Sequence, residues 1–389
     1  MKKLIYVLVL PLLMSCKKNT ALQNMVINDS LFQVVTINPD NINKKEPGKI
    51  SMFAESVEYI PLQTEDDMLI GEITRLIVWK DMYYIWDRLS ETVFCFGQDG
   101  KFRYRLSKQG EAPDEYFNIA DFTLDMESGN MVVYSDRGQA LYEYSATSEL
   151  VEKLDVPFIM SSFAVKGDWK YCYLGRLPNM RFYEDVFPKS YRYATLQNKN
   201  VCNEYLPYKF DESFLKVPLS SNNFTFYGDT ILLTEFLSPE IFSIDTLGRL
   251  CPRYRIEFTT NTYTPNFEEP VDLDKMKRTV KEGKLTTLYG AFYENTNYMF
   301  FNYSRGLIGL AYVDKREGLV HNPGYFLLDD FNQNTLSVSI ACVDEEYLYL
   351  IGEPELLLKK KINLSSYLRG ICNNLHDFDN PVIIRIKLK

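Results

Sequence analysis

Most of the chain after residue 56 alternates apolar and polar residues, the period-two pattern of half-buried β-strands. The segments 78–101 and 226–249 also align with each other without a gap. In both copies, turn residues separate the apolar runs at the same places, with Asp99-Gly100 in the first copy and Leu247-Gly248 in the second. Glycine after Asp between apolar runs is a strong hairpin signal. Each copy therefore predicts four strands joined by tight turns.

Related patterns recur in 122–154, 298–318 and 337–358, while the region 159–222 fits less well and its boundaries stay open. Four-strand units repeated every ~40 to 55 residues are typical of β-propeller blades. The span from Val57 to Lys389 has room for about six such units. We therefore predict an all-β fold, a six-bladed β-propeller with four-stranded antiparallel blades. Helical solenoids do not match the period of two, and a β-sandwich does not require the same strand order to recur.

Three segments predict features beyond the repeat. The run 272–284 has apolar residues at helical spacing among charges, which predicts a short surface helix between blades. An apolar alternation around Phe32–Ile37 predicts one short strand. We also expect the strand 57–62 to pair with the last blade near 382–388, because propellers usually close by joining the two chain ends in one sheet.

The first residues predict export. Lys2 and Lys3 precede an apolar stretch, Leu4 to Leu13, which is too short for a transmembrane helix and suits a signal peptide. The following Leu13-Met14-Ser15-Cys16 resembles a lipobox, which implies cleavage before Cys16 and lipid attachment to its thiol. The predicted organisation is a signal peptide in 1–15, a lipidated tether in 16–50 and the propeller in 51–389. The alternative is an ordinary signal peptide followed by a chance cysteine.

Composition narrows the function classes. The net charge of −9 opposes binding to phosphate backbones, so we expect no nucleic-acid partner. Aromatic residues make up 14% of the chain, which favours β structure. Six cysteines follow Cys16, and those in strand-like runs, such as Cys95 and Cys172, predict mainly free, buried thiols.

The chain resembles the six-bladed β-propeller lipoproteins of gut-type Gram-negative anaerobes, which are similar to propellers of the NHL-repeat class. The resemblance covers nearly the whole mature sequence. It is carried by Ser56–Leu62, Gly71-Glu72-Ile73, Gln98–Phe102, Gln109-Gly110 with Pro113, Glu115 and Tyr116, Tyr298–Phe301 and Asn380–Ile384. It implies a fold and a cellular address but no activity.

The sequence departs from that family in the loop after the first predicted blade. Ser107, Ala112 and Asp114 stand where the family usually has glycine. If the loop needed positive φ angles at these positions, each would cost roughly 1 kcal/mol.

Candidate chemistry is sparse. The two histidines, His321 and His376, exclude a multi-histidine metal centre, and we expect each to be a surface or hydrogen-bonded residue rather than a base. The acidic clusters 65–67 and 344–346 could bind calcium or act on sugars, but they lack calcium-loop spacing and suit solvated turns. Tyr and Phe near a propeller mouth could stack on a ligand, although most are expected to pack between blades. We predict no cofactor and no metal, and no catalytic residue can be named.

These observations favour a binding or interaction scaffold in the cell envelope, with its ligand unknown. We expect it to be attached to the membrane through Cys16 and to bind an envelope protein or a glycan. Because no acidic run follows Cys16, the periplasmic face of the outer membrane is the expected location. The alternative is a carboxylate-dependent hydrolase or lyase that acts on a glycan at the central face. It predicts converging Asp, Glu, Arg or Tyr side chains with perturbed pKa values, whereas a scaffold predicts an apolar or aromatic patch. A purely structural envelope protein would show neither feature.

Overall fold

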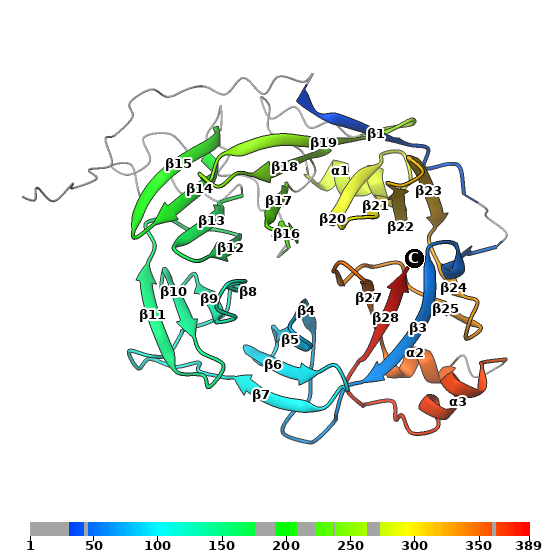
Figure 1. Ribbon diagram of the computed structural model, residues 1–389, viewed down its shortest axis with the longest axis horizontal. Helices are drawn as coiled ribbons and strands as arrows, with labels where there is room; N and C mark the ends of the chain where they lie inside the picture. Colours follow the sequence, from blue (N-terminus) through cyan, green and yellow to red (C-terminus); the bar gives the residue numbers. More distant parts are fainter. Residues whose placement is uncertain are drawn as a thin grey trace, which may run out of the picture.

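A computed structural model describes residues 31–42, 46–175, 191–207, 222–235, 238–262, 273–359 and 363–389. The predicted signal peptide and Cys16 lie outside these residues. The strands form sheets that stand around a common axis, and β4, β8, β12, β16 and β20 lie nearest the centre (Figure 1). This radial arrangement of small sheets defines a β-propeller.

Six of the sheets contain a four-stranded antiparallel unit. The first two are built from β4 (Ile73–Trp79), β5 (Met82–Asp87), β6 (Thr92–Gly97) and β7 (Phe102–Leu106), and from β8 (Asp121–Leu124), β9 (Met131–Ser135), β10 (Ala140–Tyr144) and β11 (Leu150–Asp155). The next two are built from β12 (Ser162–Lys166), β13 (Trp169–Tyr173), β14 (Tyr191–Gln197) and β15 (Asn200–Pro207), and from β16 (Phe224–Tyr227), β17 (Thr230–Thr234), β18 (Glu240–Ile244) and β19 (Leu250–Phe258). The last two are built from β20 (Thr287–Glu294), β21 (Tyr298–Arg305), β22 (Leu307–Asp314) and β23 (Leu319–Gly324), and from β26 (Cys342–Val343), β27 (Tyr347–Gly352), β28 (Val382–Leu388) and β3 (Ala54–Pro61).

The predicted number of six blades is wrong, because the described residues form seven sheets. The additional sheet is three-stranded, with β2 (Gly48–Lys49) parallel to β24 (Leu327–Asp329) and β25 (Asn334–Leu336) antiparallel to β24. It contacts the outer strand β23 and the turn before β3, and its two buried leucines join the core between those sheets. Counted with this short sheet, the propeller has seven blades. Strands of two or three residues are too short to show a period of two, which is why the repeat pattern missed them.

The repeat itself is confirmed. Lys80-Asp81 joins β4 to β5, and the aligned Gly228-Asp229 joins β16 to β17. Gly100 and Gly248, aligned in the two copies, both adopt positive φ angles of 74° and 75°. In the loop after the first blade, Ser107, Ala112 and Asp114 stand where the family usually has glycine. None of the three is among the residues with positive φ, so the backbone is not strained there.

The predicted segments outside the repeat also form. Strand β1 (Gln33–Ile37) adds to the outer edge of the β16–β19 sheet, parallel to β19. Helix α1 (Leu273–Lys281) confirms the surface helix before β20, although Asp272, the first residue of the predicted run, lies outside the described residues. Two further short helices, α2 (Pro354–Lys359) and α3 (Ser366–Cys372), separate β27 from β28, and a 3-10 turn, η2 (Ile50–Met52), precedes β3. None of the described helices is long and apolar enough to cross a membrane.

The ring is closed by the two ends of the propeller, as predicted. Strand β3 pairs antiparallel with β28, so that Val57 lies opposite Ile386 and Pro61 opposite Val382. Alternate positions of β28 are buried, with Val382 and Ile386 at 0% exposure. The last sheet therefore takes three strands from the C-terminal part of the chain and one from residues 54–61.

Aromatic and aliphatic side chains pack between neighbouring sheets. Six apolar clusters occupy the six junctions between adjacent four-stranded units. At the closing junction, the rings of Tyr83 and Tyr349 meet edge to face at 6.1 Å. The six described cysteines are free, and Cys95 and Cys172 are buried within strands, which confirms the interpretation of these thiols. Most aromatic side chains are thus part of the packing between blades.

Truncating Ile386 tests the closure. Ile386→Ala should lower the free energy of unfolding by about 2 to 5 kcal/mol, since it leaves a cavity in the closing sheet. Lys387→Ala on the same strand is the control and should change it by less than about 0.5 kcal/mol, because the Lys387 ion pair with Glu55 is exposed. Urea denaturation measures both values. Equal losses for the two variants would contradict the proposed role of β28.

Candidate functional site

A cavity of about 360 Å³ occupies the central channel. Residues of all six innermost strands or their turns line it: Arg75, Leu76, Ile77, Val78, Thr123, Met126, Phe163, Asn222, Phe224, Thr225, Phe226, Tyr227, Gly228, Tyr293, Glu294, Ala341, Cys342, Val343, Asp344 and Glu345. Gly228, Asp344 and Glu345 belong to the turns that follow the innermost strands, so the cavity extends to the face of the propeller that carries these turns. The volume is of the size that holds a small ligand or one side chain of a larger partner.

The cavity wall is mainly apolar and aromatic. Strand β16 contributes Phe224, Phe226 and Tyr227, and the neighbouring strands contribute Phe163 and Tyr293. Phe226 and Tyr227 are only partly buried, which leaves ring surface open to the cavity. Aromatic faces of this kind bind flat or apolar groups at low entropic cost.

Polar groups on the wall hold Tyr293 in place. The side-chain amide of Asn222 donates to the Tyr293 hydroxyl at 2.9 Å, and that hydroxyl donates to the Ala341 carbonyl at 3.1 Å. Burial raises the pKa of Tyr293 well above its usual value. The hydroxyl therefore stays protonated at neutral pH and bridges three neighbouring sheets.

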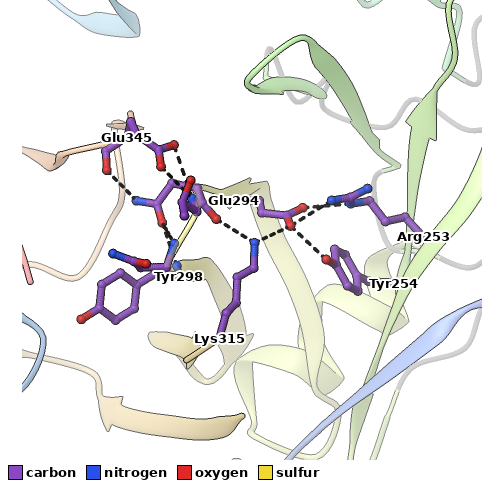
Figure 2. Close-up of polar contacts among 9 residues, drawn as sticks. Arg253, Tyr254, Glu294, Tyr298, Lys315 and Glu345 are labelled. Carbon is purple, nitrogen blue, oxygen red and sulfur yellow. Dashed lines mark hydrogen bonds and ion pairs between the residues drawn. The ribbon is translucent and has the colours of Figure 1, made fainter. Parts of the chain in front are cut away.

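A buried carboxylate organises the cavity wall next to Tyr227. Glu294, at the end of β20, accepts hydrogen bonds from the Arg253 guanidinium to both oxygens, at 2.9 Å each. Its Oε1 also accepts from the Tyr254 hydroxyl and the Lys315 ammonium, each at 2.9 Å. Figure 2 shows Arg253, Tyr254 and Lys315 all pointing to this carboxylate. Because Arg253 and Tyr254 lie on β19, the network ties two adjacent sheets together.

The charges of this network also surround Tyr227. The Lys315 ammonium lies 4.6 Å from the centre of the Tyr227 ring, and the Arg253 guanidinium lies 5.6 Å from it. Burial of Glu294 opposes its ionisation, but the bonds and charges of Arg253 and Lys315 outweigh burial and hold the pKa of Glu294 below its usual value. Glu294 is therefore a charged, fully occupied acceptor at neutral pH and has no proton to give.

A second buried ion pair lies on the opposite side of the channel. Arg75 of β4 borders the cavity and pairs with Asp121 of β8 at 2.8 Å. Arg75 also donates to the Phe122 carbonyl, while Asp121 accepts from the Phe163 backbone N–H at 3.0 Å. Burial raises the pKa of Asp121 to about 7, although Arg75 and the Phe163 N–H act in the opposite direction.

The histidines are remote from this cavity. His321 is part of the outer strand β23 and stacks on Tyr312, with ring centres 4.6 Å apart. His376 is exposed beside Asp379, with its ring nitrogen 3.5 Å from the carboxylate. Neither histidine is among the residues that line the channel.

The acidic clusters are turns, and only one reaches the cavity. Asp344 accepts from the backbone N–H groups of Glu346 and Tyr347 and from the Tyr349 hydroxyl, so its carboxylate organises the turn before β27. Glu345 accepts from the Thr296 backbone N–H at 3.1 Å. The cluster 65–67 lies in the turn after β3. Within the described residues, no group of three His, Cys, Asp or Glu side chains is arranged to hold a metal ion.

The charged residues that matter most at the cavity were not predicted from the sequence. Arg75 stands in the run Ile73-Thr74-Arg75-Leu76-Ile77-Val78-Trp79, and a lone charge inside such an apolar strand is a signal that could have been used. Glu294 likewise ends the run Ala291-Phe292-Tyr293. The partners carry no comparable signal, because Arg253 alternates with Arg255 in β19 and Lys315 lies in the charged turn after β22.

The fold and the channel define the class of protein, a β-propeller. The chain belongs to the family described as a domain of unknown function, DUF4934, which it matches over residues 32–387. No curated protein sequence matches the chain.

Two solved structures have a similar fold. A Bacteroides fragilis protein, described as a candidate exported protein, superposes with a TM-score of 0.73 at 13% identity, over 92% of this chain and 100% of that one. A member of the DUF4221 family from Bacteroides vulgatus superposes with a TM-score of 0.52 at 10% identity, over 86% of this chain and 96% of that one. These similarities support the β-propeller expectation as a fold.

Removing the charge of Glu294 tests the network. Glu294→Gln should lower the free energy of unfolding at pH 7 by about 3 kcal/mol, because it leaves two cations without their buried carboxylate. Because the pKa of Glu294 is lowered on folding, its stabilisation is present above the usual Glu pKa and is lost in acid. The gap between wild type and variant should therefore shrink below about pH 4.

Glu240→Gln is the matched control for this experiment. It removes a carboxylate that pairs with Arg255 at 2.8 Å in a more exposed position, and should cost about 1 kcal/mol or less. Chemical denaturation from pH 3 to 7 measures both variants. A pH-independent effect of Glu294→Gln would contradict the charge-based account.

Proposed function

We propose that this chain is an exported, lipid-anchored protein of the cell envelope whose propeller binds a ligand in its central channel. The cavity between the innermost strands carries the binding part of this proposal. The lipobox-like Leu13-Met14-Ser15-Cys16 supports the anchor, with the membrane bound through the lipid on Cys16. The similar fold of a protein described as exported is consistent with this address. The expected location is the outer membrane, facing the periplasm.

The chemistry of the cavity favours binding over catalysis. The wall has an aromatic surface, as expected of a scaffold. It also has charged side chains, as expected of an enzyme. However, Glu294 is ionised and saturated by donors, and the Tyr293 hydroxyl is held protonated between two partners. Such groups position a ligand better than they move a proton. A carboxylate-dependent hydrolase or lyase stays a hypothesis.

The group that occupies the channel is either a small molecule or one part of an envelope protein or glycan. The rings of Phe226 and Tyr227 would contact the flat or apolar part of that group. Lys315 and Arg253 fix the Tyr227 ring, so the aromatic wall is rigid before the ligand arrives.

Filling the cavity tests ligand binding. N-phenyl-1-naphthylamine, an uncharged aromatic probe that fluoresces in apolar sites, should bind the wild-type protein at one saturable site. Ala341→Phe adds a ring at the cavity wall and should weaken this binding by about 10-fold or more. The matched control Ala146→Phe places the same ring in an exposed turn and should leave binding unchanged. Absence of saturable binding by the wild type, or equal binding by Ala341→Phe, would contradict the channel as the site.

Replacing Cys16 tests the anchor. The wild-type protein, expressed in a Gram-negative host, should sediment with membranes, and mass spectrometry should show an acylated N-terminal cysteine. Cys16→Ala should abolish both results, while Cys202→Ala, which removes an exposed thiol in β15, should abolish neither. A Cys16→Ala protein that still carries an N-terminal lipid or sediments fully with membranes would refute the anchor.

A further inference from the structure

The only cationic side chain among the residues that line the described cavity is Arg75. It lies in the middle of the innermost strand β4 and is only 7% exposed. Placing a guanidinium in such a position costs free energy unless its charge and all its donors are satisfied. The number of guanidinium donors with a hydrogen-bond partner therefore indicates whether Asp121 alone is sufficient to stabilise Arg75 in this position.

The hydrogen bonding of this buried pair is incomplete. The Nε donor of Arg75 has no hydrogen-bond partner, whereas a terminal nitrogen of the same guanidinium contacts the Oδ1 atom of Asp121 at 2.8 Å. A second buried pair, Arg192 with Glu235, shows the complete arrangement. There, Nε and a terminal guanidinium nitrogen bind the two carboxylate oxygens at 2.6 and 3.2 Å. Unsatisfied polar groups in a buried pair are uncommon, and a bound water, ion or ligand is one of the explanations for them.

The charge of Arg75 also acts on the channel. It opposes the rise that burial causes in the pKa of Tyr293, a residue of β20 on another part of the cavity wall. Asp121 is the counter-ion of this charge, although burial opposes the ionisation of its carboxyl group and raises its pKa. The charge of Arg75 thus acts inside a mainly apolar wall, where electrostatic interactions are stronger than in water.

The negative groups that line the cavity are already occupied. Asp344 binds the Tyr347 N–H and the Tyr349 hydroxyl, and Glu345 binds the Thr296 N–H. Both belong to the turn after β26, while Arg75 lies within β4, four residues before Trp79, the last residue of this strand. Glu294 is neutralised by two cations. A ligand can therefore place a negative group at Arg75 and its apolar body along Phe226 and Tyr227.

We propose that the channel binds an organic anion with an aromatic or aliphatic body, whose carboxylate or sulfonate accepts hydrogen bonds from Arg75. This inference rests on the proposed function, because it assigns the chemical class of the ligand to the same cavity. The anion pairs with the guanidinium, and the aromatic wall covers the body of the ligand.

Paired probes test the charge requirement on the full mature protein. 1-Anilinonaphthalene-8-sulfonate is an anion with nearly the same ring system as the uncharged N-phenyl-1-naphthylamine. Arg75→Gln should weaken binding of the sulfonate by about 10-fold or more and change binding of the uncharged probe by less than about 2-fold. The control Arg192→Gln, which breaks a buried pair that does not border the cavity, should change the binding of neither probe.

A competition experiment on the wild type covers the case in which Arg75→Gln does not fold. 3-Phenylpropionate should displace the uncharged probe at a concentration about 10-fold lower than its neutral analogue 3-phenylpropionamide. Equal displacement by the two compounds, or equal weakening of both naphthalene probes by Arg75→Gln, would overturn the anion proposal and leave the channel as a neutral site. If the uncharged probe itself does not bind, the proposed function fails as well.

Discussion

The pairing of β3 with β28 is the interaction on which the rest of the structure depends. The ring is held closed because its last sheet takes strands from both ends of the propeller, and residues 54–61 supply the N-terminal one. The junction then buries Tyr83 of the first blade against Tyr349 of the last. Opening this pairing would expose apolar surface on both sides and would release the innermost strands from their fixed positions around the channel.

The cavity is a consequence of this closure. Its charged side chains come from strands that are far apart in sequence and meet only because the ring is complete. Arg75 and Asp121 connect the first two sheets, while Glu294, Arg253 and Lys315 connect the β16–β19 and β20–β23 sheets. One of these networks is saturated and stiffens the wall, and the other has an unsatisfied Arg75 Nε beside the cavity. The Glu294 network therefore has no free group for a ligand, whereas Arg75 offers a positive charge to a negative group of the ligand.

Local patterns explain how much of this could be predicted from the sequence. The period-two runs and turn pairs such as Asp99-Gly100 predicted the four-stranded units, because these units depend on neighbours along the chain. The pairing of 57–62 with 382–388 was predicted from the usual way in which propellers close. The sheet of β2, β24 and β25 was missed, since its strands are too short to show a period. The position of Arg75 at the cavity wall could not be predicted, because it depends on how the sheets are placed around the axis.

The most direct test of the central claim is a crystal structure of the protein soaked with 3-(4-bromophenyl)propionate, in which anomalous scattering locates the bromine. The account predicts one bromine peak in the channel near Phe226 and Tyr227, with the carboxylate in hydrogen-bonding contact with Arg75. Bromine peaks only on the outer surface, or a channel peak with the carboxylate turned away from Arg75, would contradict it.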